Sequence, residues 1–334
     1  MILVTGAAGH IGNVLVRELL NDGRQVRGLI LPGEDISALE GLQIEIIEGN
    51  VLEEESLVEA MRGVDLVFHL AGIISILPGA DALMRQVNVE GTRIVLAAAR
   101  RAGVRRLVYT SSIHALSRHE AGMIDERVPF DPHNPAGEYD RTKAQASLLV
   151  LEAARQGLDA VVVCPTGVIG PFDYRGSEIG DLLQSWMRKK PHLLIEGAYD
   201  FVDVRDVARG HILAAERGRA GEVYILSGRQ IKLFQLKQMV QDVLGWQTLT
   251  VTVPNNLARF ASGIMPFFYR LSKKTPKFTD YSLETVQSNS DISCGKARRE
   301  LGYQPRQLAA TIGDTVRWWL QRRKMQKAPG KSDT

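Results

Sequence analysis

The sequence is poor in cysteine and in net charge, and it lacks long apolar runs. Its two cysteines, Cys164 and Cys294, supply neither a disulfide framework nor a metal cluster, so we predict no bound metal. A net charge of +3 is too small to indicate binding of nucleic acid. No apolar run reaches the roughly 18 residues that cross a bilayer. Because a strand is predicted from Met1, we expect no signal peptide, no stable membrane insertion and a cytoplasmic location.

What the sequence does contain is a regular alternation of strand and helix patterns over its first half. The 334 residues, 45% of them hydrophobic, are enough for one large or two medium domains. The predicted strands are 1–5, 25–31, 43–48, 64–71, 105–110 and 160–164, and the predicted helices are 11–21, 53–61, 82–101 and 136–154. This order predicts an α/β fold with a doubly wound parallel sheet of the Rossmann kind.

The pattern loosens after Cys164, which suggests a second unit. We assign residues 1–165 plus 198–228 to a dinucleotide-binding domain. Residues 166–197 plus 229–322 are assigned to a smaller, mostly helical C-terminal substrate domain. The basic residues 323–334 are predicted to be a frayed tail.

A glycine-rich turn follows the first strand and opens the first helix. Gly6 permits the tight turn, Gly9 lets the backbone approach a pyrophosphate, and Gly12 lets the helix pack close to the strand. The phosphates would bind the free amides of the helix N-terminus, so the turn indicates NAD(P). The second strand ends without a carboxylate that would repel a 2′-phosphate, because Glu34 and Asp35 lie past the turn. We therefore lean slightly to NADP.

Tyr139 and Lys143 stand four residues apart in a predicted helix and so share one face. About thirty residues earlier, Ser111 and Ser112 directly follow a predicted strand. The lysine cation would lower the pKa of Tyr139 toward neutrality, and the tyrosine would exchange a proton with a carbinol oxygen. A serine hydroxyl would polarise the same oxygen. Either serine satisfies this chemistry.

These motifs together resemble the extended short-chain dehydrogenase/reductases over nearly the whole chain. The matching segments are Thr5–Gly12, Gly49–Val51, Phe68–Gly72, Asn88–Thr92, Tyr109–Ser112, Tyr139–Lys143, Pro165–Pro171 and Phe201–Ala208. The resemblance implies that Ser112, Tyr139 and Lys143 are catalytic, with Ser111 a rival for Ser112. It implies a cofactor site of Gly6, Gly9, His10, Ile11, Gly12, Asn50, Val51, Leu70, Ala71, Gly72, Asn88, Thr110, Ser111, Tyr139, Lys143, Pro165 and Val168. Asn50 stands where the family usually has an aspartate facing adenine.

Within the family, the chain looks most like dihydroflavonol-reductase-like and 3β-hydroxysteroid-dehydrogenase-like members. It lacks the Val-Tyr-Gly turn after the serine that is usual in nucleotide-sugar epimerases, and the carboxylate pair of the dehydratases. The resemblance favours an enzyme that reduces a carbonyl, or oxidises the alcohol, of a small or apolar substrate. A nucleotide-sugar epimerase or dehydratase is the alternative, and a non-catalytic NAD(P)-sensing module is a third. A homodimer is left open. His114, after the serines, either reaches substrate or only packs, and the aromatic segment 257–271 is expected to cover substrate.

Overall fold

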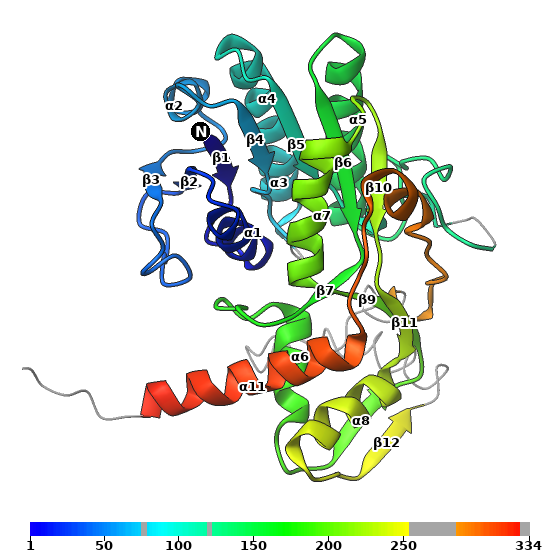
Figure 1. Cartoon of the computed structure of the whole chain (residues 1–334). Coiled ribbons are helices and arrows are strands. Elements are labelled where there is room, and N and C mark those ends of the chain that lie inside the picture. The colour runs from blue at the N-terminus through cyan, green and yellow to red at the C-terminus, as the bar shows by residue number, and fades with distance from the viewer. Residues whose placement is uncertain (75–78, 119–121, 254–284, 328–334) are drawn as a thin grey trace, which may run out of the picture.

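A computed structural model of the chain describes residues 1–74, 79–118, 122–253 and 285–327 (Figure 1). Its centre is a seven-stranded sheet with the order β10-β6-β5-β4-β1-β2-β3, and every neighbouring pair in it is parallel. The strands are β1 (Ile2–Thr5), β2 (Val26–Ile30), β3 (Glu45–Glu48), β4 (Leu66–His69), β5 (Arg106–Thr110), β6 (Ala160–Pro165) and β10 (Val223–Leu226). The order reverses between β1 and β4, as in a Rossmann fold, which confirms the predicted fold class.

Helices cover both faces of this sheet. On one face α1 (His10–Asn21) packs against α7 (Val204–Arg217), and the two lie side by side in Figure 1. The other face carries α2 (Glu54–Ala60), α4 (Gly91–Arg101) and α5 (Glu138–Arg155). The predicted helix over 82–101 is a continuous helical run of α3 (Asp81–Met84), a π-helical segment (Arg85–Glu90) and α4. All carboxyl ends of the central strands meet at one edge, where ligands of such sheets bind.

The second unit contains two small sheets as well as helices. One sheet joins β7 (Gly167–Ile169), β9 (Ala198–Asp203) and β11 (Arg229–Lys232), and the other pairs β8 (His192–Ile195) with β12 (Thr250–Val253). The helices are α6 (Glu178–Trp186), α8 (Leu233–Leu244) and α11 (Leu308–Lys327). Strand β9 therefore belongs to the smaller sheet, although residues from 198 were assigned to the dinucleotide-binding domain.

The last helix extends into the segment that was expected to be a tail. Helix α11 continues to Lys327, so residues 323–327 are helical, and residues 328–334 lie outside the described part. Segment 257–271 falls outside the described residues too. Within the described part, no helix is both long and apolar enough to cross a membrane.

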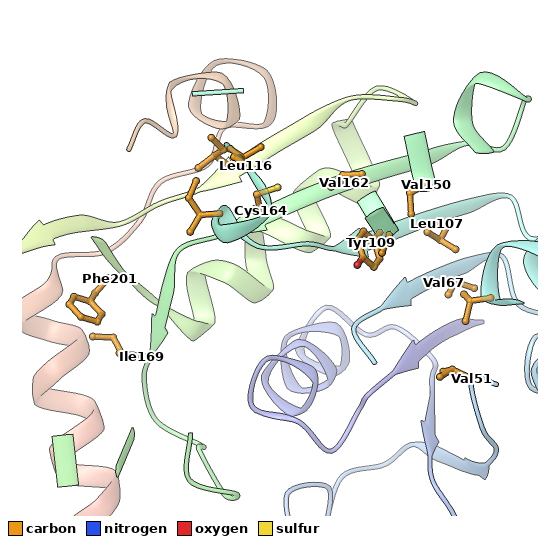
Figure 2. Close-up of a cluster of buried hydrophobic side chains, with 14 of the residues drawn as sticks. Val51, Val67, Leu107, Tyr109, Leu116, Val150, Val162, Cys164, Ile169 and Phe201 are labelled. Atoms are coloured by element: carbon orange, nitrogen blue, oxygen red, sulfur yellow. The ribbon is translucent and has the colours of Figure 1, made fainter. Parts of the chain in front are cut away.

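The hydrophobic core runs continuously from the central sheet into the second unit. Figure 2 shows one cluster whose side chains come from β4, β5, β6 and α5 and from the small sheet. Labelled members are Val51, Val67, Leu107, Tyr109, Leu116, Val150, Val162, Cys164, Ile169 and Phe201. Because Ile169 and Phe201 belong to this same cluster, the small sheet is fixed against the carboxyl edge of the large one. That packing determines which residues of the second unit lie near the candidate site.

Candidate active site

The glycine turn between β1 and α1 has the geometry of a phosphate cradle. Gly6 has a φ of +66°, and a Cβ there would lie 2.9 Å from the amide nitrogen of Ala71. A Cβ on Gly12 would lie 2.1 Å from the carbonyl oxygen of Gly6, so Gly12 is required for packing. A Cβ on Gly9 would meet only that carbonyl, at 3.2 Å. The open side of Gly9 and the free amides at the start of α1 suit a pyrophosphate, so the residues present fit a dinucleotide.

A buried hydrogen-bond chain joins this turn to the loop after β4. The hydroxyl of Thr92 donates to a main-chain carbonyl of its own helix, so it accepts from His69 Nε2 at 3.0 Å. His69 Nδ1 then accepts from the Thr5 hydroxyl at 2.9 Å. The Thr5 oxygen in turn accepts the amide protons of Leu70 and Ala71. Burial lowers the pKa of His69 to about 3, so the ring stays neutral and holds Ala71 beside Gly6.

Asn88 holds the backbone that follows, and it reaches the helix that carries Tyr139 and Lys143. Its side chain exchanges two hydrogen bonds with the main chain of Ile73 and donates to Thr142 of α5. A Cβ on Gly72 would lie 3.1 Å from Asn88 Oδ1, so glycine permits this approach. The structure therefore gives the Asn88 side chain a role in positioning Gly72. Further along the edge, Asn50 Oδ1 accepts the amide of Leu52, and Val51 packs under Gly91.

The two candidate serines differ in what they contact. Ser111 bonds Ser147 across 2.6 Å, and Ser147 donates to a main-chain carbonyl of α5, so Ser111 faces the packed helix. Ser112 caps a short 3₁₀ turn, where its Oγ accepts the amide of His114. A hydrogen bond with Ser112 also lowers the pKa of Tyr139 in part. Ser111 is thus turned toward Ser147, and Ser112 is the serine that influences the tyrosine hydroxyl.

Lys143 lies beneath this pair, with its charge buried. Its Nζ donates to the carbonyl of Thr110 at 2.5 Å and lies 4.6 Å from the centre of the Tyr109 ring. Burial lowers the pKa of Lys143 to about 7. His211 Nδ1 donates to a carbonyl of α7, so His211 Nε2 carries no proton. Nε2 therefore accepts a hydrogen bond from the Thr110 hydroxyl, at 2.7 Å. Nothing in the sequence marked His211 as part of this arrangement.

The pKa of Tyr139 moves in the direction opposite to our expectation. Burial raises it to about 12, and the bond with Ser112 offsets only part of this increase. Lys143 does not lower the pKa of Tyr139 toward neutrality here, since its own ammonium is disfavoured by the same burial. Tyr139 consequently holds its proton at neutral pH.

The segment after β6 is tied to the start of α1. His10 Nε2 lies 3.0 Å from the carbonyl of Pro171, and the Asn13 amide donates to the carbonyl of Phe172. Phe172 adopts a φ of +67°, a conformation that non-glycine residues rarely take. Pro165 ends β6 and Val168 is half-buried on β7, so both stand at the carboxyl edge of the sheet. The His10 side chain therefore fastens the second unit, while its main chain begins α1.

A carboxylate does reach the end of β2, contrary to the sequence-based reasoning. The Glu34 side chain folds back, and its Oε2 accepts the amide of Leu31 at 2.8 Å. Its Oε1 pairs with Arg175, which also donates to the carbonyl of Asp35. Leu31 directly follows β2, the position from which an acidic side chain contacts the adenosine ribose in Rossmann folds. Only folding of the chain after Leu31 brings Glu34 there.

A second polar cluster borders Ser112 and Tyr139. It comprises His114 and Arg118, which follow β5, Asp140 of α5 and Tyr199 of β9. The imidazole of His114 stacks on the ring of Tyr199 with centroids 5.8 Å apart, and meets the ring of Tyr139 edge-on at 6.3 Å. Sequence reasoning left His114 open and missed the other three, because they come from separate elements.

The fold and the glycine turn define a dinucleotide-binding protein, and comparison with known proteins narrows this class. The chain belongs to the NAD dependent epimerase/dehydratase family, whose model matches residues 2–227. It is an NAD(P)-dependent oxidoreductase of the extended short-chain dehydrogenase/reductase type, which confirms the predicted resemblance.

Three relatives show which members of the family the chain is similar to. It is 34% identical to a sterol demethylase protein B of Methylococcus capsulatus, over 96% of this chain and 98% of that protein. It is 30% identical to a putative dihydroflavonol 4-reductase of Synechocystis, over 95% and 93%. It is also 30% identical to a 3 beta-hydroxysteroid dehydrogenase/Delta 5-->4-isomerase of Mycobacterium tuberculosis, over 91% and 86%. Reductase-like and hydroxysteroid-dehydrogenase-like relatives are thus present, as the sequence motifs predicted.

Proposed function

We propose that this protein interconverts a secondary alcohol and a ketone on a compact, apolar substrate, with Ser112, Tyr139 and Lys143 as its catalytic residues. The observation that carries the proposal is the meeting of three groups at the carboxyl end of β5. Ser112 is near enough to Tyr139 to lower the pKa of its hydroxyl, and Lys143 donates to the carbonyl of Thr110, immediately before the serines. Ser112 and Lys143 are buried, so substrate chemistry there would be shielded from water.

Each residue has a definite task in this mechanism. The nicotinamide cofactor, when bound, supplies or accepts the hydride. In the reductive direction Tyr139 donates its hydroxyl proton to the carbonyl oxygen, and the Ser112 hydroxyl stabilises the charge developing on that oxygen. A pKa of about 12 keeps this proton on Tyr139 until the substrate oxygen needs it. For alcohol oxidation the same residue must first lose its proton, so a rising pH favours the oxidative direction.

Lys143 lies where it would contact the ribose next to the nicotinamide. Its Nζ would lie 4.0 Å from a Cβ on Gly72, which belongs to the loop after β4. The ammonium form supplies positive charge beneath the reacting oxygen. With a pKa of about 7, a substantial part of Lys143 is neutral at physiological pH. Retention of the ammonium therefore becomes a determinant of activity.

We infer a preference for NAD over NADP. The sequence alone favoured NADP because no carboxylate ends the second strand, and that reason no longer holds once Glu34 folds onto Leu31. A carboxylate there accepts ribose hydroxyls and repels a 2′-phosphate. Calorimetric titration of the protein with NAD and with NADP tests this preference, and tighter binding of NADP would contradict it.

The names of the relatives suggest the class of substrate. Two of the three act, by name, on sterols or steroids, and they align over at least 86% of their own length. We therefore propose a ring alcohol or ketone of sterol or steroid type. Dihydroflavonols follow from the third relative as a second substrate class to assay.

The test is turnover by the purified protein with NAD or NADP, followed by nicotinamide absorbance. The panel contains a 3β-hydroxysteroid, a 3-ketosteroid, a dihydroflavonol and UDP- and dTDP-sugars. We expect a net cofactor change with the steroid pair. Conversion of a nucleotide sugar without net cofactor change would establish the epimerase alternative, and cofactor binding without any turnover would favour a sensing module.

Tyr139→Phe is the variant that tests the mechanism. It removes one hydroxyl, so turnover should fall by about 10²- to 10⁴-fold while cofactor affinity persists. Tyr224→Phe is the control, because Tyr224 is a buried tyrosine whose hydroxyl donates to Glu300 at the edge of the sheet. Full activity of Tyr139→Phe would refute the assigned roles.

A further inference from the structure

The polar cluster beside Ser112 combines buried groups from three parts of the chain. Asp140 is 0% exposed and Tyr199 is 5% exposed. Arg118 donates to Asp140 Oδ1 at 2.7 Å and contacts Nδ1 of His114 with the same nitrogen. His114 Nε2 lies 2.7 Å from the hydroxyl oxygen of Tyr199. The cluster is therefore a chain of contacts from α5 to β9.

The donors and acceptors in this chain fix the position of the proton on His114. A guanidinium group only donates hydrogen bonds, so Nδ1 of His114 must accept from Arg118. Asp140 Oδ1 is 3.5 Å from Nδ1, longer than a normal hydrogen bond, and receives its proton from Arg118. Burial lowers the pKa of His114; Asp140 opposes this change, and the charge of Arg118 adds a smaller decrease. A neutral imidazole with an acceptor at Nδ1 carries its proton on Nε2.

This tautomer determines what Tyr199 can do. In this tautomer His114 Nε2 donates to the Tyr199 oxygen, so the hydroxyl proton of Tyr199 is not given to His114. Among the described residues, His114 is the hydrogen-bond partner that the structure gives Tyr199. Burial raises the pKa of Tyr199, so the hydroxyl remains a donor at any working pH. Within the described part of the chain this donor has no second acceptor, so it is available to a bound molecule.

Tyr199 also lies next to the reacting groups. The His114 ring contacts the rings of both Tyr199 and Tyr139, so the two tyrosines are one imidazole apart. Tyr199 reaches this place because residue 167 is glycine: a Cβ there would lie 2.8 Å from the Tyr199 ring. The same His114 gives its main-chain amide to Ser112.

We propose that Tyr199 is a specificity-determining residue that donates its hydroxyl proton to a second oxygen of the substrate, and that His114 positions it. The second oxygen is an acceptor on a carbon next to the one that is oxidised or reduced. Preferred substrates are therefore ketones or alcohols with a neighbouring ester, carboxylate, carbonyl or hydroxyl group. This inference rests on the proposed oxidoreductase function. It adds a feature of the substrate that Ser112, Tyr139 and Lys143 do not recognise.

The substrate requirement is tested with two ketones that differ in one group, cyclohexanone and ethyl 2-oxocyclohexanecarboxylate. The wild-type protein should have the higher kcat/KM for the keto ester. Tyr199→Phe should reduce that preference by about tenfold, the scale of one hydrogen bond. Tyr224→Phe is the control and should leave the preference intact. An unchanged preference in Tyr199→Phe would overturn the proposal.

The positioning role of His114 has its own tests. His114→Gln keeps an N–H donor for Tyr199 and should retain part of the preference, whereas His114→Leu should lose it. Nitrogen-15 NMR of histidine-labelled protein should show His114 protonated at Nε2 and bare at Nδ1. That signal is assigned by its loss in His114→Gln. An imidazolium or an Nδ1–H tautomer at neutral pH would contradict the assignment, whether or not a substrate is known.

The outcome also separates this inference from the proposed function. Tyr139→Phe should abolish turnover of both ketones alike. If it does not, the catalytic assignment fails. If Tyr139→Phe behaves as expected and Tyr199→Phe leaves the substrate ratio unchanged, only the present inference fails.

Discussion

Replacing Lys143 by methionine should stabilise the protein in the absence of cofactor while destroying its activity. Methionine keeps an unbranched side chain that is one atom shorter than lysine, and it removes the buried charge. Burial moves the pKa of Lys143 from 10.5 to about 7, a change of about 3.5 units. At 1.36 kcal/mol per unit, the charged lysine costs the folded state about 5 kcal/mol below pH 7. Removing this cost stabilises the variant, but losing the hydrogen bond to Thr110 destabilises it by about 1–3 kcal/mol.

The sign of the pH dependence follows from where the proton is bound. Between pH 7 and pH 10.5 the unfolded chain keeps the Lys143 proton and the native protein has released it, so wild-type stability rises with pH in this window. Between pH 6 and pH 9, Lys143 raises the free energy of unfolding of the wild type by about 3 kcal/mol. The variant lacks this increase. Its free energy of unfolding should therefore exceed that of the wild type by about 3 kcal/mol at pH 6 and be nearly equal to it at pH 9.

The measurement is urea unfolding of both proteins without cofactor at the two pH values. Other titrating groups cancel in the difference between the proteins. Lys237→Met is the matched control, because Lys237 is also buried but its Nζ has acceptors in Gln241, Thr248 and Thr250. It should be less stable than the wild type at both pH values. A stability difference for Lys143→Met that is independent of pH, or a variant less stable at pH 6, would refute the buried-charge explanation.

Two further predictions concern the cofactor site. Gly9→Ala places its Cβ on the open side of the turn, so the protein should fold but lose its affinity for NAD, as measured by calorimetry. Gly12→Ala places its Cβ against the Gly6 carbonyl and should fail to fold. Undiminished NAD binding by folded Gly9→Ala would show that the dinucleotide lies elsewhere. Glu34→Gln removes the charge at the end of β2 and frees Arg175, so the ratio of NADP to NAD affinity should rise by about tenfold. A ratio that does not move would exclude Glu34 from contact with the ribose.

Much of this protein could be predicted from local sequence. Strand and helix periodicity, together with the turn at Gly6, Gly9 and Gly12, was sufficient for the parallel sheet and its ligand-binding edge. The i, i+4 spacing of Tyr139 and Lys143 placed them on one helix face without any knowledge of packing. These features depend on backbone geometry within a single element, so neighbouring residues carry the signal.

Tertiary structure decided everything that depends on contacts between distant elements. The difference in contacts between Ser111 and Ser112 follows from which face of the β5 end meets α5, since Ser111 is bonded to Ser147. Burial raises the pKa of Tyr139, although the sequence suggested a decrease, because desolvation depends on what the rest of the chain covers.

Other features of the site have the same origin. Glu34 reaches the end of β2 only through a turn that folds back on Leu31. The pairing of His114 with Tyr199 joins residues 85 positions apart. A sequence pattern records which side chains an element presents, but hydrogen bonds and desolvation depend on the atoms that other elements bring within a few ångströms, and only the folded chain determines those.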